Sequence, residues 1–91
     1  MCFGWDPVKA VANFKKHGVR FSEVEQVFED DFAITIVDED SDPREQRFVS
    51  IGTGVKERIL VVVYCYRGRN IRIISARLAE AHERAQYEEH R

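Results

Sequence analysis

The side chains best suited to chemistry in this chain are arginines spread through its second half. They are Arg47, Arg67, Arg69, Arg72 and Arg77. A guanidinium stays charged and its planar fork donates two parallel hydrogen bonds, so arginine suits phosphate recognition. Three of these arginines surround one expected hairpin and must lie close together, with Arg47 on a neighbouring strand. Arg72 and Arg77 point to opposite faces if their strand is regular and includes both. The alternative is a solvated rim of arginines paired with acids.

Acid–base chemistry has three further candidates. His17 can give or take a proton near neutral pH, which RNA cleavage requires, or it only complements the dipole at a helix end. Glu83 and Tyr87 lie four positions apart, on one face of an expected helix. Glu83 is either a base or the partner of Arg77 or Arg84. Tyr87 either stacks on a nucleobase or packs the helix onto a sheet.

Metal and cofactor chemistry is not expected. No Cys/His pair has zinc-site spacing, and no phosphate-binding glycine loop or nucleophile elbow occurs. Cys2 and Cys65 are too few for a disulfide framework. The first residues do not have the pattern of a signal peptide, and the apolar stretch 59–65 is too short to span a bilayer. We therefore expect a cytoplasmic protein without membrane contact.

The net charge of −2 conceals a segregation of charge along the chain. Residues 1–22 carry four basic and one acidic side chains, whereas residues 23–45 carry one basic and ten acidic. Residues 46–78 carry seven basic and one acidic, and residues 79–91 two basic and four acidic. Such asymmetry indicates a basic working surface, which attracts phosphates, and a separate acidic region.

Two helices are predicted before any strand. Asp6 as a cap, Pro7 at the first position and Gly18 at the end define a helix over residues 7–17. Its expected buried face consists of Val8, Val11, Ala12 and Phe14. Ser22, with Glu25 three positions on, has the spacing of a capping box and predicts a second helix that ends at residues 29–31.

Four strands and a terminal helix should follow. The strands are predicted over residues 32–37, 47–52, 59–66 and 71–76, with an acidic loop at 38–43 and a hairpin turn at 67–70. Residues 80–89 have helical composition. Strands joined in series by short turns form an antiparallel meander, so we predict one α+β domain, residues 1–91, with two N-terminal helices, a four-stranded antiparallel meander sheet and a C-terminal helix.

Ordered strings along nearly the whole chain resemble those of a known family. The opening string runs from Phe3 to Pro7 and is followed by Lys9 and Asn13. The second is Lys16, His17, Gly18, Val19 and Phe21, closed by Val27, Phe28 and Asp30. The middle and closing strings comprise Arg47, Phe48, Gly52, the valines 61–63, residues 71–77, Glu83 and Tyr87. Together they resemble the BrnT family of toxins from type II toxin–antitoxin pairs.

The resemblance implies a RelE-like fold and ribonuclease activity that halts translation. It also implies neutralisation by a BrnA-type antitoxin, a ribbon-helix-helix protein that binds operator DNA, so that the toxin meets DNA only through its partner. The leading hypothesis is a metal-independent endoribonuclease in which the ribose 2′-hydroxyl attacks the adjacent phosphate. Such a reaction needs a base, an acid and cations around the phosphate.

Within that hypothesis each candidate has a role. The catalytic set is His17, Arg72, Arg77, Glu83 and Tyr87, with the two arginines on the phosphate, Glu83 or His17 as base or acid, and Tyr87 on the nucleotide. The RNA-binding set is Lys16, Arg47, Arg67 and Arg69. The competing hypothesis is a non-catalytic module that pairs with a DNA-binding antitoxin and tunes operon repression.

Overall fold

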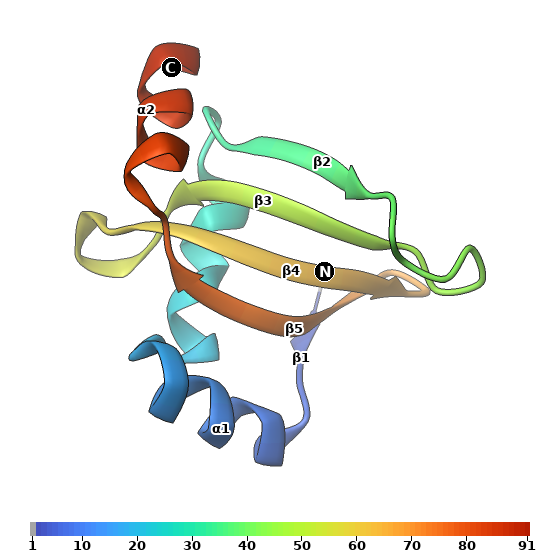
Figure 1. The fold of residues 1–91 in the computed structure, drawn as a ribbon. Coiled ribbons are helices and arrows are strands. Elements are labelled where there is room, and N and C mark those ends of the chain that lie inside the picture. The colour runs from blue at the N-terminus through green and yellow to red at the C-terminus, as the bar shows by residue number, and fades with distance from the viewer. Residues whose placement is uncertain (1) are drawn as a thin grey trace.

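The computed structural model describes residues 2–91 as an α+β fold built on a five-stranded mixed sheet. The strand order is β1-β5-β4-β3-β2 (Figure 1). The strands are β1 (Phe3–Gly4), β2 (Ile34–Asp38), β3 (Arg47–Thr53), β4 (Ile59–Arg67) and β5 (Asn70–Leu78). The helices are α1 (Pro7–His17), the 3-10 helix η1 (Phe21–Glu29), the single 3-10 turn η2 (Val55–Glu57) and α2 (Ala81–His90).

The predicted four-stranded antiparallel, RelE-like meander is wrong, because β1 adds a fifth strand. β1 runs parallel to β5, with Phe3 opposite Ile71 and Gly4 opposite Arg72. Two residues are too few to show a strand period, and the partner lies far along the chain, so no local pattern predicts this pairing. Phe3 then packs against Phe28 with ring centroids 5.1 Å apart.

Helix α1 has the predicted bounds, but it buries a different face. The Asp6 carboxylate accepts a hydrogen bond from the Val8 amide at 2.9 Å, and Gly18 ends the helix with a φ of 70°, where glycine is favoured. The predicted inward residues Val8 and Val11 are exposed, whereas Asn13 is buried. Helix α1 lies along the outer edge of β5 (Figure 1), where Asn13 satisfies polar backbone groups that an apolar side chain could not.

Asn13 ties α1 to β5 with its whole amide group. Its Nδ2 donates to the carbonyls of Val19 at 3.0 Å and Ala76 at 2.8 Å. Its Oδ1 accepts from the Ala76 amide at 3.1 Å. Asn13 thereby bonds the edge of β5 further along the strand than β1 does, and it fixes the helix beside the sheet.

The second predicted helix is a 3-10 helix rather than an α-helix, and its expected capping box does not form. Glu23, not Glu25, closes the first turn, since its carboxylate accepts from the Arg20 amide at 2.7 Å. The apolar side chains of η1 nevertheless face inward, with Val24 and Val27 fully buried. Side chains three positions apart align in a 3-10 helix, so these two valines reach the sheet together.

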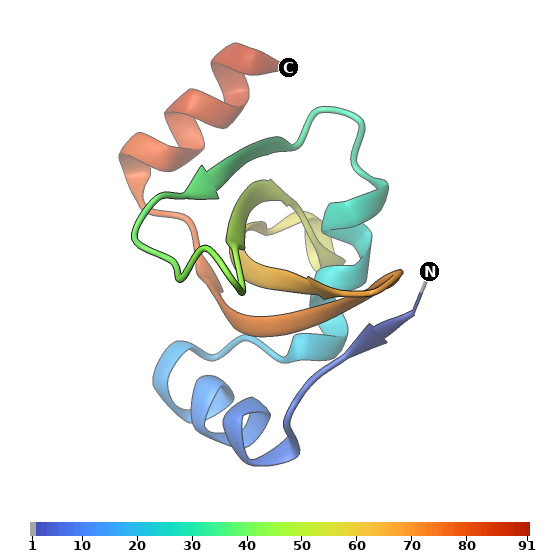
Figure 2. The same cartoon turned by 90° about the vertical axis from the view of Figure 1, so that its right-hand side faces the viewer.

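The sheet separates two apolar clusters. On one face η1 contributes Phe21 and both of its valines to a core with Leu60, Val62 and Ile73 of the central strands. On the other face α2 contributes Tyr87, which packs with Ile51 and Val61. Helix α2 and η1 lie on opposite sides of the sheet (Figure 2). Helix α2 covers only one end of that second face, so the rest of the face is left for polar side chains.

Gly52 shows how tightly η1 approaches the sheet. A Cβ atom at this position would lie 3.0 Å from Val27 Cγ1, 3.1 Å from the Ala33 Cβ and 3.3 Å from Asp30 Oδ2. The absence of a side chain in β3 therefore lets the end of η1 lie directly against the strand. None of the helices within residues 2–91 is long and apolar enough to cross a membrane.

Candidate functional site

Three strands bring basic side chains to one groove on the face of the sheet that α2 leaves uncovered. The groove has a volume of about 510 Å³. The residues that line it are Lys9, Asp42, Glu45, Arg47, Arg67, Arg72 and Ile74. Of the nine predicted site residues, Arg47, Arg67 and Arg72 are therefore together.

The strand register explains why these arginines meet. Arg47 of β3 and Arg72 of β5 both lie opposite Cys65 of β4, one on each side. Directly paired residues point to the same face of a sheet, and strands lie about 4.8 Å apart, so the two arginine backbones are roughly 10 Å apart. Arg67 is two positions beyond Cys65 and faces the same way.

Carboxylates neutralise two of the three arginines. Arg67 donates to Glu45 at 2.9 Å, and Arg47 lies 3.2 Å from Asp38. Arg72 has no carboxylate within 4.0 Å among residues 2–91. Arg72 therefore keeps its hydrogen-bonding fork for an anion that enters the groove.

Glu45 is the acidic group at the centre of this basic set. Its Oε1 accepts from Arg67 and from the Cys65 thiol, at 2.9 and 3.4 Å. The hydrogen bond from Arg67, followed by that from Cys65, lowers the pKa of the Glu45 carboxyl. The carboxyl is therefore ionised at neutral pH, and its second oxygen accepts no hydrogen bond from a side chain within residues 2–91.

A β-bulge places Arg77 on the same face as Arg72. Val63 lies opposite Ser75 and Tyr64 opposite Ile73, so Ile74 is an extra residue in β5. In a regular strand two residues five positions apart point to opposite faces, and the extra residue restores a common face. The expected opposition of the two arginines is therefore removed by the bulge.

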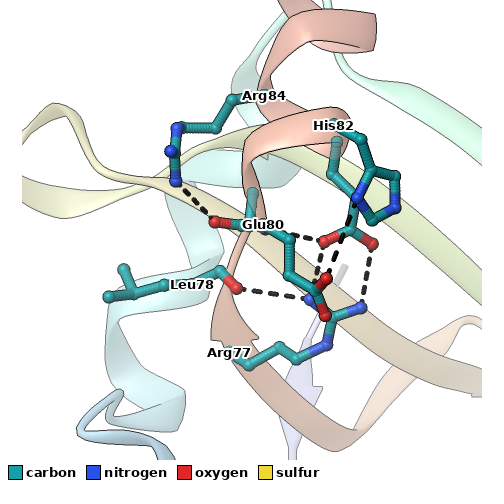
Figure 3. Close-up of polar contacts among 7 residues, drawn as sticks. Arg77, Leu78, Glu80, His82 and Arg84 are labelled. Atoms are coloured by element: carbon teal, nitrogen blue, oxygen red, sulfur yellow. Dashed lines mark hydrogen bonds and ion pairs between the residues drawn. The ribbon is translucent and has the colours of Figure 1, made fainter.

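Arg77 is nevertheless turned toward α2, where it forms a two-pronged pair with Glu83. Nη1 donates to Oε1 at 2.7 Å and Nη2 to Oε2 at 2.9 Å. Nη1 also lies 3.3 Å from the Leu78 carbonyl (Figure 3). Oε1 of Glu83 accepts in addition from the Glu80 amide at 2.8 Å, which closes the first turn of α2.

These bonds decide what Glu83 can do. The hydrogen bond from Arg77 is the largest influence on this carboxyl and outweighs the opposing effect of burial, so the pKa of Glu83 falls to about 2. Both carboxylate oxygens are occupied, and the side chain is only 13% exposed. A group held in this way is a poor proton acceptor near neutral pH, and its geometry favours the predicted pairing with Arg77 over a role as base.

Tyr87 is 2% exposed and is bonded beneath α2. Its hydroxyl donates to Asp30 Oδ2 at 2.5 Å and lies 2.9 Å from Thr53 Oγ1. Burial, followed by Asp30, raises the pKa of Tyr87. Burial alone would raise the pKa of Asp30, but hydrogen bonds from Tyr87 and from the Thr53 and Phe32 amides outweigh it and lower that pKa. The tyrosine ring is thus packed within the protein and presents no face for a nucleobase.

The remaining predicted residues lie outside the groove. His17 is partly buried at the end of α1, Lys16 is exposed beside it, and Arg69 is exposed in the β4–β5 turn. Gly68 gives that turn its positive φ of 62°, as a two-residue hairpin requires. His17 lies eight residues from Lys9, or about 12 Å along the helix axis, so α1 reaches the groove with its other end.

Four of the groove residues, Lys9, Asp42, Glu45 and Ile74, were not among the predicted site residues. Lys9 appeared only as part of a family string, and Glu45 only as one charge in an acidic block. Glu45 precedes Arg47 by two positions, so extending the strand alternation backwards would have placed both on one face. Nothing local relates Lys9 to the strands. No group of His, Cys, Asp and Glu within residues 2–91 is arranged to hold a metal ion.

Comparison with known proteins agrees with this architecture. Residues 5–83 match the family described as ribonuclease toxin, BrnT, of type II toxin-antitoxin system. The chain is also similar to the 1.1 Å crystal structure of the Brucella abortus ribonuclease toxin BrnT, with 26% sequence identity and a TM-score of 0.69. That similarity covers 88% of this chain and 97% of the Brucella chain. No curated protein sequence matches the chain significantly. The family match spans most of the chain, and the protein therefore belongs to the BrnT family of ribonuclease toxins from type II toxin–antitoxin systems.

Proposed function

We propose that this protein is a metal-independent endoribonuclease that acts in the cytoplasm and blocks translation by cleaving RNA. The observation that carries the proposal is the guanidinium of Arg72, which lies without a carboxylate partner among residues 2–91, in a groove with Lys9, Arg47 and Arg67. Cations around one phosphate stabilise the charge that develops when a hydroxyl attacks it.

The proposed reaction uses RNA as its own nucleophile. The ribose 2′-oxygen forms a bond to the adjacent phosphorus while its proton passes to a base. The bond from phosphorus to the 5′-oxygen breaks, and that oxygen takes a proton from an acid. The products are a 2′,3′-cyclic phosphate and a free 5′-hydroxyl, so neither a metal nor a protein nucleophile enters the balance.

Glu45 is the carboxylate whose position best supports the role of base. It lies in the groove beside the arginines, and only one of its oxygens is bonded to side chains within residues 2–91. Glu83 has neither property. The Lys9 ammonium is the groove group that can supply the proton to the leaving oxygen.

The other predicted residues then have supporting roles. Arg77 and Glu83 hold the start of α2 against β5, and Tyr87 anchors the same helix from beneath. We propose that Lys16, His17 and Arg69 contact RNA where it leaves the groove. In the cell the toxin is neutralised by a BrnA-type ribbon-helix-helix antitoxin, and the pair reaches operator DNA through that partner.

The test is cleavage of RNA by the purified chain in excess chelator. Wild type should cut, and Arg72→Ala should lose on the order of 10²-fold in rate, as when one charge-stabilising donor is removed. Arg44→Ala is the matched control, because Arg44 is an arginine of the same region that is highly exposed and whose side chain, within residues 2–91, is bonded to Asp42 alone. Equal rates for Arg72→Ala and Arg44→Ala would remove Arg72 from the mechanism.

A second candidate function is favoured by the carboxylates in the groove. Arg47 and Arg67 are already paired with acids, which weakens the attraction of the groove for phosphate. A non-catalytic module that only pairs with an antitoxin would cleave no RNA, either as wild type or as any of the variants. It would also fail to stop protein synthesis in a cell-free translation extract, whereas the ribonuclease should stop it and Arg72→Ala should not.

A further inference from the structure

Helix α1 presents an apolar stripe to solvent. Val8 is 76% exposed and Val11 57% exposed, and Phe14 is also partly open. These residues are spaced by three positions, as they would be if they faced a partner helix or a core. The other side of α1 is already used, because Asn13 bonds β5. No element within residues 2–91 covers the stripe.

Two adjoining surface hollows extend this stripe. The first is formed by α1 alone and includes Val8, Val11 and Lys15. The second runs from Val11 and Lys15 across Phe14 to Trp5 and Phe21. Their shared residues make one continuous apolar surface at the outside of the molecule, well suited to a rod-like apolar partner such as a helix.

The charge around this surface is positive and unbalanced. Two cations, Lys15 and Arg20, line these hollows, and neither has a carboxylate within 4.0 Å among residues 2–91. Arg20 instead lies over the Phe14 ring, with its carbon 4.1 Å from the ring centroid. The one acid of residues 1–22, Asp6, is occupied as the helix cap.

We propose that this surface binds an amphipathic helix of a partner protein, with apolar residues spaced by three or four and acidic residues on both flanks. The apolar stripe argues for protein over nucleic acid, because a phosphate backbone would leave the valines uncovered. The cations argue for acidic flanks, since opposite charge steers association and fixes register. The identity of the partner as the antitoxin rests on the proposed function, whereas the surface and its chemistry do not.

The experiment measures, by isothermal titration, binding of the purified BrnA-type antitoxin that the proposed function names as the partner. Val11→Glu places a like charge against acidic flanks and removes an apolar contact, so it should weaken binding at least tenfold. Val8→Glu should act in the same direction, which guards against a fault in one variant. Ile36→Glu is the matched control, since Ile36 is 58% exposed but lies on β2. It should bind as wild type does.

Two further measurements test the charge complementarity and the integrity of the fold. Lys15→Glu should weaken binding and reduce its dependence on salt, because one charge pair is lost. RNA cleavage by free Val11→Glu should equal that of wild type, which shows that the fold and the groove are intact. Circular dichroism should show unchanged helix content in each variant.

Each contrary outcome has its own meaning. Unchanged affinity in Val8→Glu and Val11→Glu would overturn the proposed surface and leave the ribonuclease assignment untouched. Loss of RNA binding instead of antitoxin binding would assign the surface to RNA and overturn the proposal. Failure of wild type to bind the antitoxin would overturn both this proposal and the pairing, and failure to cleave RNA would bear on the groove alone.

Discussion

Arg72 and Arg77 lie on the same face of β5 although five positions separate them. The extra residue at Ile74 changes the alternation of the strand, so both arginines face the side on which β4 presents Cys65 and Val61. Arg72 lines the groove with no carboxylate within 4.0 Å among residues 2–91, and Arg77 is bonded to Glu83 at the start of α2. The bulge thus aligns the arginine proposed to bind phosphate with the attachment of the last helix.

Replacing Arg77 should release Glu83. In Arg77→Ala the pKa of Glu83 should rise from about 2 toward its ordinary 4.5, because the principal hydrogen-bond donor is gone. A lowered folded-state pKa stabilises the fold above pH 4.5, and this contribution is lost as the pH falls toward 2. Carboxyl NMR titration measures the pKa, and urea unfolding at several pH values measures the stability.

The control for this titration is Arg84→Ala, since the Arg84 side chain donates to the Ala79 carbonyl at 2.8 Å and to no other group within residues 2–91 (Figure 3). In Arg84→Ala the pKa of Glu83 should equal that in wild type. The stability difference between wild type and Arg77→Ala should shrink near pH 2. A pKa near 2 that survives in Arg77→Ala would show that the backbone bond from Glu80 suffices to hold the charge.

Tyr87→Phe should lower stability without abolishing cleavage. The ring keeps its packing, but Asp30 and Thr53 lose the hydroxyl between them. A lost bond to a charged group inside a protein costs about 2 kcal/mol, which urea unfolding resolves. If cleavage of RNA falls sharply while the unfolding midpoint stays at the wild-type value, Tyr87 acts on the nucleotide and not on the fold.

Asn13→Ala should be strongly destabilising for a change from one polar residue. The alanine leaves the amide and carbonyl of Ala76 and the carbonyl of Val19 without their side-chain partner. Each buried group left unpaired costs about 1–3 kcal/mol, so a loss of at least about 2 kcal/mol is expected. Lys16→Ala, on the exposed side of the same helix, should change the unfolding free energy little. Similar midpoints for the two variants would contradict this account of α1.

Gly52→Ala should separate η1 from the sheet. The added methyl would meet Val27, Ala33 and Asp30 at 3.0 to 3.3 Å, and relief requires the end of η1 to move. Overpacking of this kind costs about 1–3 kcal/mol. Gly4→Ala is the control, because a Cβ there meets nothing within 4 Å. Thermal unfolding of both variants tests this expectation. Equal midpoints would mean that η1 moves away from the sheet without loss of stability.

The parts of the fold that the sequence predicts are those fixed by neighbouring residues. Helix α1 begins and ends at the predicted residues, because the Asp6 cap and the left-handed Gly18 are local signals. The inward stripe of η1 follows from spacing in the same way. The buried face of α1 does not, since the period of Val8 and Val11 shows that a face is apolar but not what covers it.

The candidate site likewise has parts that neighbouring residues predict and parts that they do not. Residue type and the hairpin were enough to predict that Arg67 and Arg72 would be neighbours. The role of Glu83 stayed open between a base and an ion-pair partner of Arg77 or Arg84. Arg77 can reach a carboxylate six positions away only if the chain turns between them. Lys9 could not be assigned, since its place in the groove depends on α1 lying against β5, far along the chain.

The sequence by itself determined the chemical inventory, the ends of α1, the four longer strands and the resemblance to the toxin family, because these reside in residue types and short spacings. Tertiary structure alone decided the parallel β1, the bulge at Ile74, the burial of Tyr87 and the outward stripe of α1. The physical reason is that strand register, the face to which a strand side chain points and the burial of a helix face all arise from contacts between distant segments. Their free energies depend on how the whole sheet packs, and no short stretch of sequence contains that information.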